Sequence, residues 1–397
     1  MKLFIVAHDI PDIKAHLMPW RTVCEVTEGL RELGHDATLV SLDNYQGPLS
    51  GEYLPSGSFA IRKYGKHLLA DLRQLERSLM PDVIFWPVSW RDPLTRTRVL
   101  ASTTAKVVGW FPGGAYDVPS AFYALRRLGL KRVLPYIMES LSLKGVQVRR
   151  WLQSGLAHQI AMTDYTARAA IKNGYSRDKV FTIPPGRENI EKEPEASVLD
   201  PEVRSWLAGR KYFLFMGPPS AIRGVFELLS AFEKAAKQDD SICLVCLFRS
   251  DAILDRDSIS ATIDTLSASD RIYVRWESVS PEELNGFIKA GYVTVMPFVM
   301  VPSEIPLAVI ETARWGKPVI TTSPGGTGEY VEQFGSAPRV GDIDALAEAM
   351  LELSNNSGYY QAMSKAANVT YLGHPTWKDV SLQWFKVAEQ ALEAGDD

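Results

Sequence analysis

The chain has 397 residues, which exceeds one ordinary hydrophobic core and predicts two domains, with three as the alternative. Hydrophobic residues make up 46% and charged residues 23%, as in an ordinary globular protein. The formal net charge of −4 excludes a global electrostatic footprint for nucleic acid.

Short β-branched or aromatic runs alternate with longer helical patterns along the first half. The run LFIVA at 3–7 predicts a strand, and the amphipathic stretch 20–33 predicts a helix that ends at Gly34. Similar apolar runs predict further strands at 37–41, 82–86, 106–111, 158–163 and 179–184. Apolar strands separated by helices indicate a parallel sheet covered on both faces.

The polar stretch RENIEKEPEASVLDP has the composition of a linker. After it, a second strand series is predicted at 212–217, 242–248, 271–276, 293–298 and 318–322. One helix in this series has Ser280 as N-cap, Pro281 in its first turn, Glu283 completing a capping box and Gly291 at its end. We therefore predict an α/β protein with two Rossmann-like domains facing each other across a cleft, each with its ligand crevice at the strand C-termini.

Three cysteines are too few for a disulfide framework, and their odd number fits a reducing compartment. Cys243 and Cys246 have CxxC spacing, but they stand in a strand pattern, where positions three apart point to opposite faces. The start MKLFIVAHD is too short and too weakly basic for a signal peptide, and no run approaches the ~18 apolar residues of a membrane span. The expected location is the cytoplasm.

The segment FMGPPSAIRGVFELLSAFEKA places Gly217 at a strand end and Arg223–Gly224 before an amphipathic helix. Such a loop brings backbone amides and a guanidinium to a helix N-terminus, which suits a diphosphate. A plain strand-to-helix turn with a surface arginine is the alternative, and it is the commoner explanation of such a loop taken alone.

The segment PFVMVPSEIPLAVIETARWGKPVITTSPGGTGEYV carries the second signal. Residues 304–307 are expected to start a helix, with Pro306 in its first turn. If both are helical, Glu304 and Glu311 lie about two turns apart on one face and can accept hydrogen bonds from sugar and ribose hydroxyls. A glycine-rich loop at 324–329 follows. Taken alone, the two glutamates also fit a solvated helix face, and the glycine-rich loop also fits a plain turn. Their joint occurrence at successive strand ends favours a binding site.

These segments, with SPEELNGFIKAGYVTVMPF before the second, resemble the GT-B retaining glycosyltransferases of family 4, the "glycosyl transferases group 1". The resemblance is strong over about 212–341 and weaker in the first half, in LRELGHDATLVS and MTDYTARAAIKNGYSRDKVFTIPPG. It implies that a nucleotide-diphosphate sugar binds the C-terminal half. A hydroxyl acceptor, which is a glycan, a lipid-linked compound or a small molecule, binds the N-terminal half, and the product retains the donor's anomeric configuration.

With this resemblance, the expected N-terminal acceptor domain is 1–190, the linker 191–210 and the C-terminal nucleotide-sugar domain 211–376. Residues 377–397 are expected to form a helix that returns to the N-terminal domain, as in the family. The implied donor site comprises Gly217, Arg223, Gly224, Glu304, Pro306, Leu307, Glu311, Gly325 and Gly326.

Single residues match the family unevenly. Glu311 matches the second glutamate of its pair and is expected to hold the ribose. Glu304 is similar to the first glutamate of the pair, but it lies one residue closer to Glu311 than is usual in the family. At the usual spacing this chain has Ser303. Arg223 matches the basic residue of the family's Lys–Gly step, whereas Pro218 stands where another basic residue is usual.

One diphosphate contact is therefore missing or comes from elsewhere, with Arg187 and Lys317 as candidates. The resemblance places the nucleobase near 276–279. Many family members carry a histidine near Gly113–Gly114, which this chain lacks.

Sugar transfer requires stabilisation of a diphosphate leaving group and of an oxocarbenium-like centre. Arg223, helix N-termini and loop amides can serve the first purpose without a metal, and DRD at 255–257 is interpreted as a surface turn, so we predict no metal and no other cofactor. Catalytic roles are assigned to Arg223 and Glu304. Base candidates are His8 and Asp117; the leaving phosphate is an alternative, and His8 also fits as a packing residue.

The stretch 126–150 contains a single acid, Glu139, and many bases: Arg126, Arg127, Lys131, Arg132, Lys144, Arg149 and Arg150. Interleaved apolar residues at helical spacing suit peripheral contact with the inner face of an anionic membrane that carries a lipid-linked acceptor. A helix with a solvated basic face is the alternative and is favoured.

Two rival functions stay open. One is a catalytically degenerate donor-binding scaffold, suggested by Pro218 and the shifted Glu304. The other is a sugar-nucleotide epimerase or a phosphorylase on the same architecture, which fold analogy alone does not separate from a transferase.

Overall fold

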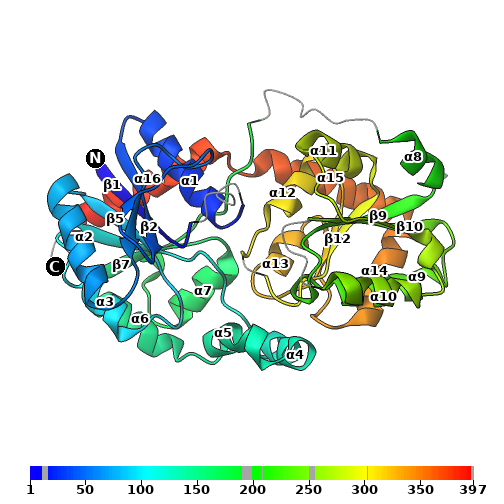
Figure 1. Cartoon of the computed structure of the whole chain (residues 1–397), viewed down its shortest axis with the longest axis horizontal. Coiled ribbons are helices and arrows are strands. Elements are labelled where there is room, and N and C mark those ends of the chain that lie inside the picture. Colours follow the sequence, from blue (N-terminus) through cyan, green and yellow to red (C-terminus); the bar gives the residue numbers. More distant parts are fainter. Residues whose placement is uncertain (11–16, 190–198, 208, 250–254, 302, 395–397) are drawn as a thin grey trace.

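Two sheets, each flanked by helices, organise the chain (Figure 1). The structure is a computed structural model that describes residues 1–10, 17–189, 199–207, 209–249, 255–301 and 303–394. The first sheet has the strand order β3-β4-β2-β1-β5-β6-β7-β8, and only the β3–β4 pair is antiparallel among the described strands. The second has the order β11-β10-β9-β12-β13-β14, and its described pairs are parallel. The predicted α/β class with two Rossmann-like halves is confirmed.

The first half contains the strands β1 (Lys2–His8), β2 (Asp36–Asp43), β3 (Gly47–Pro48), β4 (Phe59–Arg62), β5 (Val83–Pro87), β6 (Lys106–Trp110), β7 (Leu156–Ala161) and β8 (Val180–Thr182). Its helices are α1 (Trp20–Glu32), α2 (Gly65–Leu79), α3 (Leu94–Leu100), α4 (Val118–Leu128), α5 (Leu130–Ser140), α6 (Lys144–Gln153), α7 (Asp164–Lys172) and the 3-10 turn η2 (Arg177–Lys179). Gly34 follows α1 with a φ of +87°, as a left-handed helix end requires.

The second half contains β9 (Lys211–Gly217), β10 (Ile242–Phe248), β11 (Ile272–Arg275), β12 (Val293–Met296), β13 (Val319–Thr321) and β14 (Gly335–Ser336). Its helices are α8 (Pro201–Leu207), α9 (Val225–Ala236), α10 (Arg256–Asp264), α11 (Pro281–Ala290), α12 (Leu307–Arg314), α13 (Thr327–Val331), α14 (Ile343–Asn355) and α15 (Ser357–Gly373), with the 3-10 turns η3 (Ala221–Arg223) and η4 (Ser269–Arg271). The last helix, α16 (Trp377–Glu393), crosses back to the first half (Figure 1).

Each sheet has an apolar core on both faces. In the second half, Cys246 belongs to the cluster around Phe232, whereas Cys243 belongs to the cluster around Tyr212. The two cysteines therefore lie on opposite faces of the sheet, as predicted. They are buried thiols, and burial raises the pKa of Cys243 to about 12.

The beginning of α12 differs from the expectation. Pro306 is its N-cap, with a ψ of 135°, and the helix begins at Leu307. Glu304 therefore lies before the helix, and the prediction that it shares a helix face with Glu311 is wrong. The cause is local: the residue before a proline avoids the α conformation, so Ile305 cannot extend the helix backwards.

The signals around α11 hold in part. Ser280 is the N-cap and accepts a hydrogen bond from the amide of Glu283 at 3.2 Å, with Pro281 in the first turn and Gly291 at the end. The carboxylate of Glu283 pairs with Arg275 instead of completing a capping box. The ion pair with Arg275 at the end of β11 thus replaces the hydrogen bond from the Ser280 amide that a capping box would need.

The domain boundaries stay a prediction, since residues 190–198 and 208 of the linker region lie outside the described residues. Within that region α8 packs Val203 and Leu207 into a core of the second half. The helix α16 contacts α1, β5, β6 and β7 of the first half. Its buried Trp384 lies 4.8 Å from the Phe85 ring and 5.9 Å from the Trp110 ring.

Trp384→Ala tests how strongly α16 holds the first half. Because the indole is 2% exposed and fills a core between α16 and the sheet, its loss should destabilise the first half by about 3–5 kcal/mol. The free energy of unfolding is measured by urea titration followed by far-ultraviolet circular dichroism, which reports on the backbone and not on the tryptophan that is removed. Leu382→Ala, at a 39% exposed position of the same helix, is the control, and an equal effect of the two substitutions would contradict the prediction.

Candidate functional site

The strand ends of the two sheets face each other at the junction of the halves. From the second half come the loops after β9, β12 and β13, and from the first half come those after β6 and β7. The C-terminal edges of parallel strands are where open α/β sheets bind ligands. The predicted donor residues lie at the end of β9, on these loops or on the helix that follows one of them.

Arg223 ends the turn η3, which follows β9 and precedes α9. The turn is fixed by its neighbours: Asp255 Oδ2 accepts a hydrogen bond from the Ala221 amide at 2.9 Å. Gly224 has a φ of +75°, and a Cβ there would collide with the carbonyl of Pro297. A glycine after Arg223 is therefore required by conformation and by space.

The guanidinium of Arg223 lies over the ring of Phe298, 5.3 Å from its centre. Burial, and then the nearby positive charge of Arg249, lower the pKa of Arg223 to about 10. No carboxylate pairs with Arg223 among the residues that the structure describes. A half-buried cation in this state favours an anionic ligand.

Arg249 is a site residue that sequence reasoning missed. It follows β10, and its amide donates to the carbonyl of Gly217 at 3.1 Å, so the strand register places it beside Pro218. The candidates proposed for the missing basic contact lie elsewhere. Arg187 binds the carbonyls of Leu372 and His374 at the end of α15, and Lys317 precedes β13, at the opposite edge of the sheet.

Glu304 is buried between the two halves, at 1% exposure. Its Oε1 accepts hydrogen bonds from the Thr166 hydroxyl at 2.7 Å and from the Gly326 amide at 3.3 Å. Its Oε2 has no hydrogen-bond partner among the described residues. Burial raises the pKa of Glu304 to about 7, although bonds from Thr166, Thr163 and Gly326 lower it.

Glycines make this contact between the halves possible. A Cβ at Gly114 would collide with the carboxylate of Glu304, and one at Gly326 would collide with Thr163. Gly325 has a φ of +73°, and a Cβ there would lie 3.1 Å from the carbonyl of Ala115. The two glycine-rich loops thus fit each other with no room for side chains.

Glu311 lies in α12, and its carboxylate has no hydrogen bond within the described part of the chain. Burial raises its pKa, which Arg21 of the first half partly offsets. Arg21 itself pairs with Glu25 and Glu188. The carboxylate of Glu311 therefore lies under the electrostatic influence of the first half.

The two base candidates are engaged in local structure. Nε2 of His8 lies 3.2 Å from a guanidinium nitrogen of Arg96, and burial followed by Arg96 lowers the pKa of His8 to about 3. Asp117 caps α4 by accepting bonds from the amide and hydroxyl of Ser120 at 2.7 and 2.8 Å. The environment of His8 disfavours proton uptake by its imidazole at neutral pH, and the carboxylate of Asp117 is occupied in capping α4.

Other expected regions are placed as follows. The ring of Trp276 lies 4.7 Å from that of Phe248, tilted by 31°, and under the guanidinium of Arg256 at 4.8 Å. The DRD sequence starts α10, and Asp255 binds the η3 turn. The described residues contain no group of three His, Cys, Asp or Glu side chains placed to hold a metal ion.

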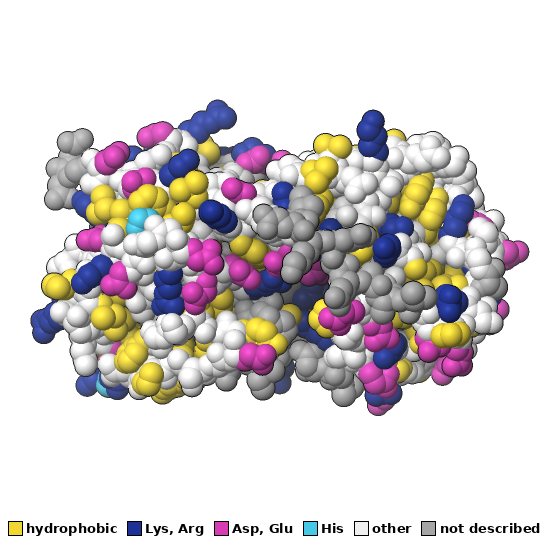
Figure 2. Space-filling view, turned by 90° about the horizontal axis from the view of Figure 1, so that it is seen from above, with side chains coloured by type: hydrophobic (Ala, Val, Ile, Leu, Met, Phe, Trp, Pro, Cys, Tyr) yellow, Lys and Arg dark blue, Asp and Glu magenta, His cyan; other side chains and the backbone are white. Residues whose placement is uncertain are grey.

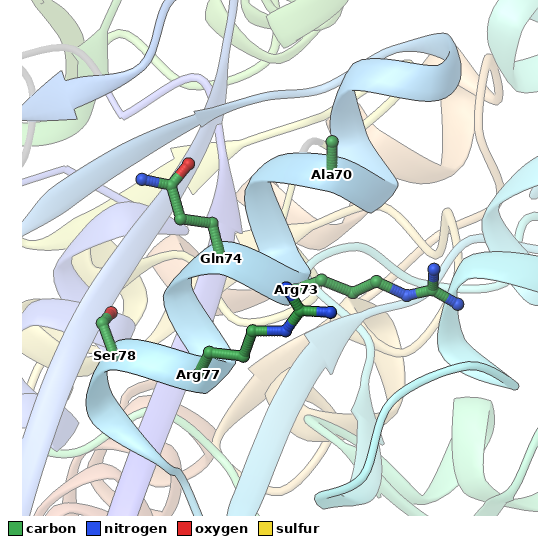
Figure 3. A pocket seen from close by; sticks show the side chains of 5 residues that line it. All are labelled: Ala70, Arg73, Gln74, Arg77 and Ser78. Atoms are coloured by element: carbon green, nitrogen blue, oxygen red, sulfur yellow. The ribbon is translucent and has the colours of Figure 1, made fainter.

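The surface of the described residues has a hollow away from the strand ends and a mixed charge distribution. A shallow hollow over α2 is lined by Ala70, Arg73, Gln74, Arg77 and Ser78, away from the junction (Figures 1 and 3). Lys and Arg alternate with Asp and Glu over the face seen in Figure 2, so no single-sign field covers it. No described helix is long and apolar enough to cross a bilayer.

Comparison with known structures supports the architecture. Sucrose-phosphate synthase from Thermosynechococcus elongatus has a TM-score of 0.72 at 16% identity, with all of both chains covered. A glycosyltransferase from Rickettsia africae has a TM-score of 0.67 at 15% identity, with 99% of each chain covered. HepE from Anabaena, in complex with UDP-glucose, has a TM-score of 0.64 at 14% identity, with 98% of this chain and 99% of HepE covered. At these identities the likeness shows the GT-B fold alone.

Sequence comparison adds a family to the second half. A comparison with curated proteins found no match. Residues 200–370, which include Arg223, Glu304 and Glu311, match the family model "Glycosyl transferases group 1". The match makes this part of the chain similar to that family, and the GT-B fold extends the likeness to the whole chain at the level of architecture.

Proposed function

We propose that the protein transfers a sugar from a nucleotide-diphosphate sugar to a hydroxyl acceptor, with retention of the anomeric configuration and without a metal. The observation that carries this proposal is the pair Arg223 and Arg249 at the strand ends of the second half, in the same half as Glu304, whose buried carboxylate is bonded to Thr166 across the junction. Two guanidinium groups suit a diphosphate, and a carboxylate suits a sugar. The UDP-glucose complex of HepE, which shares the fold, agrees with this donor class.

Each residue then has a role. Arg223, helped by the amides of the Gly325–Gly326 loop, stabilises the charge that develops on the departing diphosphate. Glu304 accepts hydrogen bonds from the transferred sugar, and Glu311 accepts them from the ribose. Because His8 and Asp117 are committed to Arg96 and to the cap of α4, we assign proton acceptance to the leaving phosphate.

A donor panel tests this proposal. Thermal unfolding is followed with UDP-, GDP-, ADP- and dTDP-sugars, because binding to the folded state alone raises its stability by about 2.7 kcal/mol at a hundred times Kd. One nucleotide class should raise the melting temperature, and Arg223→Ala and Glu311→Ala should abolish the shift. Arg210→Ala, whose guanidinium lies over Trp206, and Glu348→Ala on the surface of α14 should keep it.

Product analysis then separates the rival functions. An acceptor that gains a sugar with unchanged anomeric configuration, seen by NMR, supports retaining transfer. A nucleotide sugar altered at another carbon supports an epimerase. Donor binding without turnover by any acceptor supports a scaffold, and no binding of any donor contradicts the proposed site. The cytoplasmic location stays a prediction.

We also propose that the segment 118–146, which contains most of the basic stretch predicted for membrane contact, docks on an anionic membrane. Its outer surface exposes large apolar side chains: Val118, Phe122, Leu130, Leu134, Met138, Leu141, Leu143 and Val146. Leu130, Leu134 and Met138 recur every four residues and form one stripe on α5. The opposite side of α5 packs Val133 against the second half.

The charges of this segment match an anionic surface. Arg126 and Lys131 are exposed and have no acidic partner in the described parts of the chain. Glu139, the one acidic residue between 118 and 153, is turned inward and accepts hydrogen bonds from Ser89 and Trp90, with its pKa raised by burial. The outer surface is therefore apolar and cationic, which suits a bilayer with anionic lipids.

Vesicle binding measures this contact. The wild-type protein should sediment with vesicles containing phosphatidylglycerol and less with phosphatidylcholine alone. Leu134→Glu with Met138→Glu should weaken binding at least about tenfold, because two exposed apolar side chains that would enter the bilayer are replaced by negative charges. The control, Val369→Glu with Leu372→Glu on exposed positions of α15, should not weaken it. Equal binding of wild type and the α5 variant would refute the proposal.

A further inference from the structure

Glu304, a side chain of the second half, receives hydroxyl hydrogen bonds from the first half. The donors belong to the start of α7: Thr163 is its N-cap, and Thr166 stands in its first turn. The hydroxyl of Thr166 accepts a bond from the Ala115 amide at 3.0 Å and donates to Glu304 at 2.7 Å. Since a hydroxyl has one proton, the Ala115 amide fixes the direction in which Thr166 donates.

Thr166 and its neighbours decide the charge of this carboxylate. The residues that face it from other elements are Glu329 of α13 and the phenols Tyr116 and Tyr165. The guanidinium of Arg168, also on α7, is committed to both carboxylate oxygens of Glu329 at 2.9 and 2.7 Å. The charged form of Glu304 is thus favoured by hydroxyl and amide donors and by the N-terminus of α7, against the cost of burial.

We propose that Thr166 is a positioning residue for Glu304, which favours the ionised form of the carboxylate and orients it when the two halves close over it. This rests on the proposed role of Glu304 in binding the transferred sugar. Closure removes water from the carboxylate, and without a replacement donor the carboxylate would take up a proton. The hydrogen-bond donor Thr166 belongs to the first half, so the same closure that removes water from Glu304 also brings the hydroxyl that replaces it.

The charge state matters for the proposed transfer. A carboxylate accepts hydrogen bonds from sugar hydroxyls with both oxygens and stabilises positive charge near the anomeric carbon. A protonated carboxyl has one fewer acceptor position and no negative charge. Oε2, which has no partner among the described residues, is the oxygen left for the sugar.

Thr166→Val removes the hydroxyl at nearly constant volume. In protein labelled with ¹³C at the glutamate carboxyl carbons, the NMR signal of Glu304 is assigned by its loss in Glu304→Gln and then titrated. The pKa should rise by about one unit in Thr166→Val, because one hydrogen bond to the charged form is lost. Thr166→Ser should restore it, and Thr27→Val, which removes a buried hydroxyl within α1, should leave it unchanged. An unchanged pKa in Thr166→Val would overturn the proposal.

Gly114→Ala gives a shift in the opposite direction. Its Cβ would collide with Glu304 and hold the halves apart, so the carboxylate should be hydrated and its pKa should fall towards 4.5. Small-angle scattering should show a larger radius of gyration. If both quantities match the wild type, the closed contact does not form in solution and the proposal fails. These measurements use no nucleotide, so a failure of the donor panel contradicts the proposed function alone.

Discussion

The contact between the C-terminal edges of the two sheets determines what the rest of the structure can do. It is mainly apolar: Tyr116, Ala124 and Val133 of the first half join a core built around the loop after β12. The hydroxyl of Tyr116 donates to the carbonyl of Val301, and Tyr123 donates to Glu227 of α9 at 2.9 Å. This packing brings loops of both halves close enough for Glu304 to be bonded across the junction.

The same junction concentrates ionisable groups whose charged forms are disfavoured. Burial and Arg249 act against the charge on Arg223, and burial acts against the charge on Glu304. Neither group gains an oppositely charged partner among the residues described, so a purely structural role would leave the charge on Arg223 uncompensated and the charge on Glu304 offset only by the Thr166 and Gly326 donors. An anion at Arg223 and hydroxyl donors at Glu304 would offset them, and a nucleotide-diphosphate sugar carries both. Perturbed groups of this kind cluster at functional sites.

Sequence patterns predicted local features well because those features depend on neighbouring residues. Apolar runs located the central strands of both sheets but missed β3, β4 and β14. Gly34 marked the end of α1, and alternation placed Cys243 and Cys246 on opposite faces. The start of α12 was wrong because the helical period was extended through Ile305, where Pro306 forbids it.

Contacts between distant segments were not predictable from one sequence. Thr166 and Glu304 are 138 residues apart, and nothing local to either threonine of α7 marks a partner in the other half. Arg249 becomes a neighbour of Pro218 only through the register of β10 on β9. Each depends on how strands pair and halves close, which periodicity does not encode.

The departures from the family pattern fit one another in the structure. Gly114 stands where a histidine is common in the resembled family, and its missing Cβ is the space that Glu304 occupies from its shifted position. Pro218 lacks a basic side chain, and Arg249 places one beside it from the adjacent strand. In a protein that has lost its function, departures from the family pattern need not be in contact with one another. Here Gly114 contacts Glu304, and Pro218 lies beside Arg249. The paired changes therefore support the proposed donor site over the alternative of a degenerate scaffold.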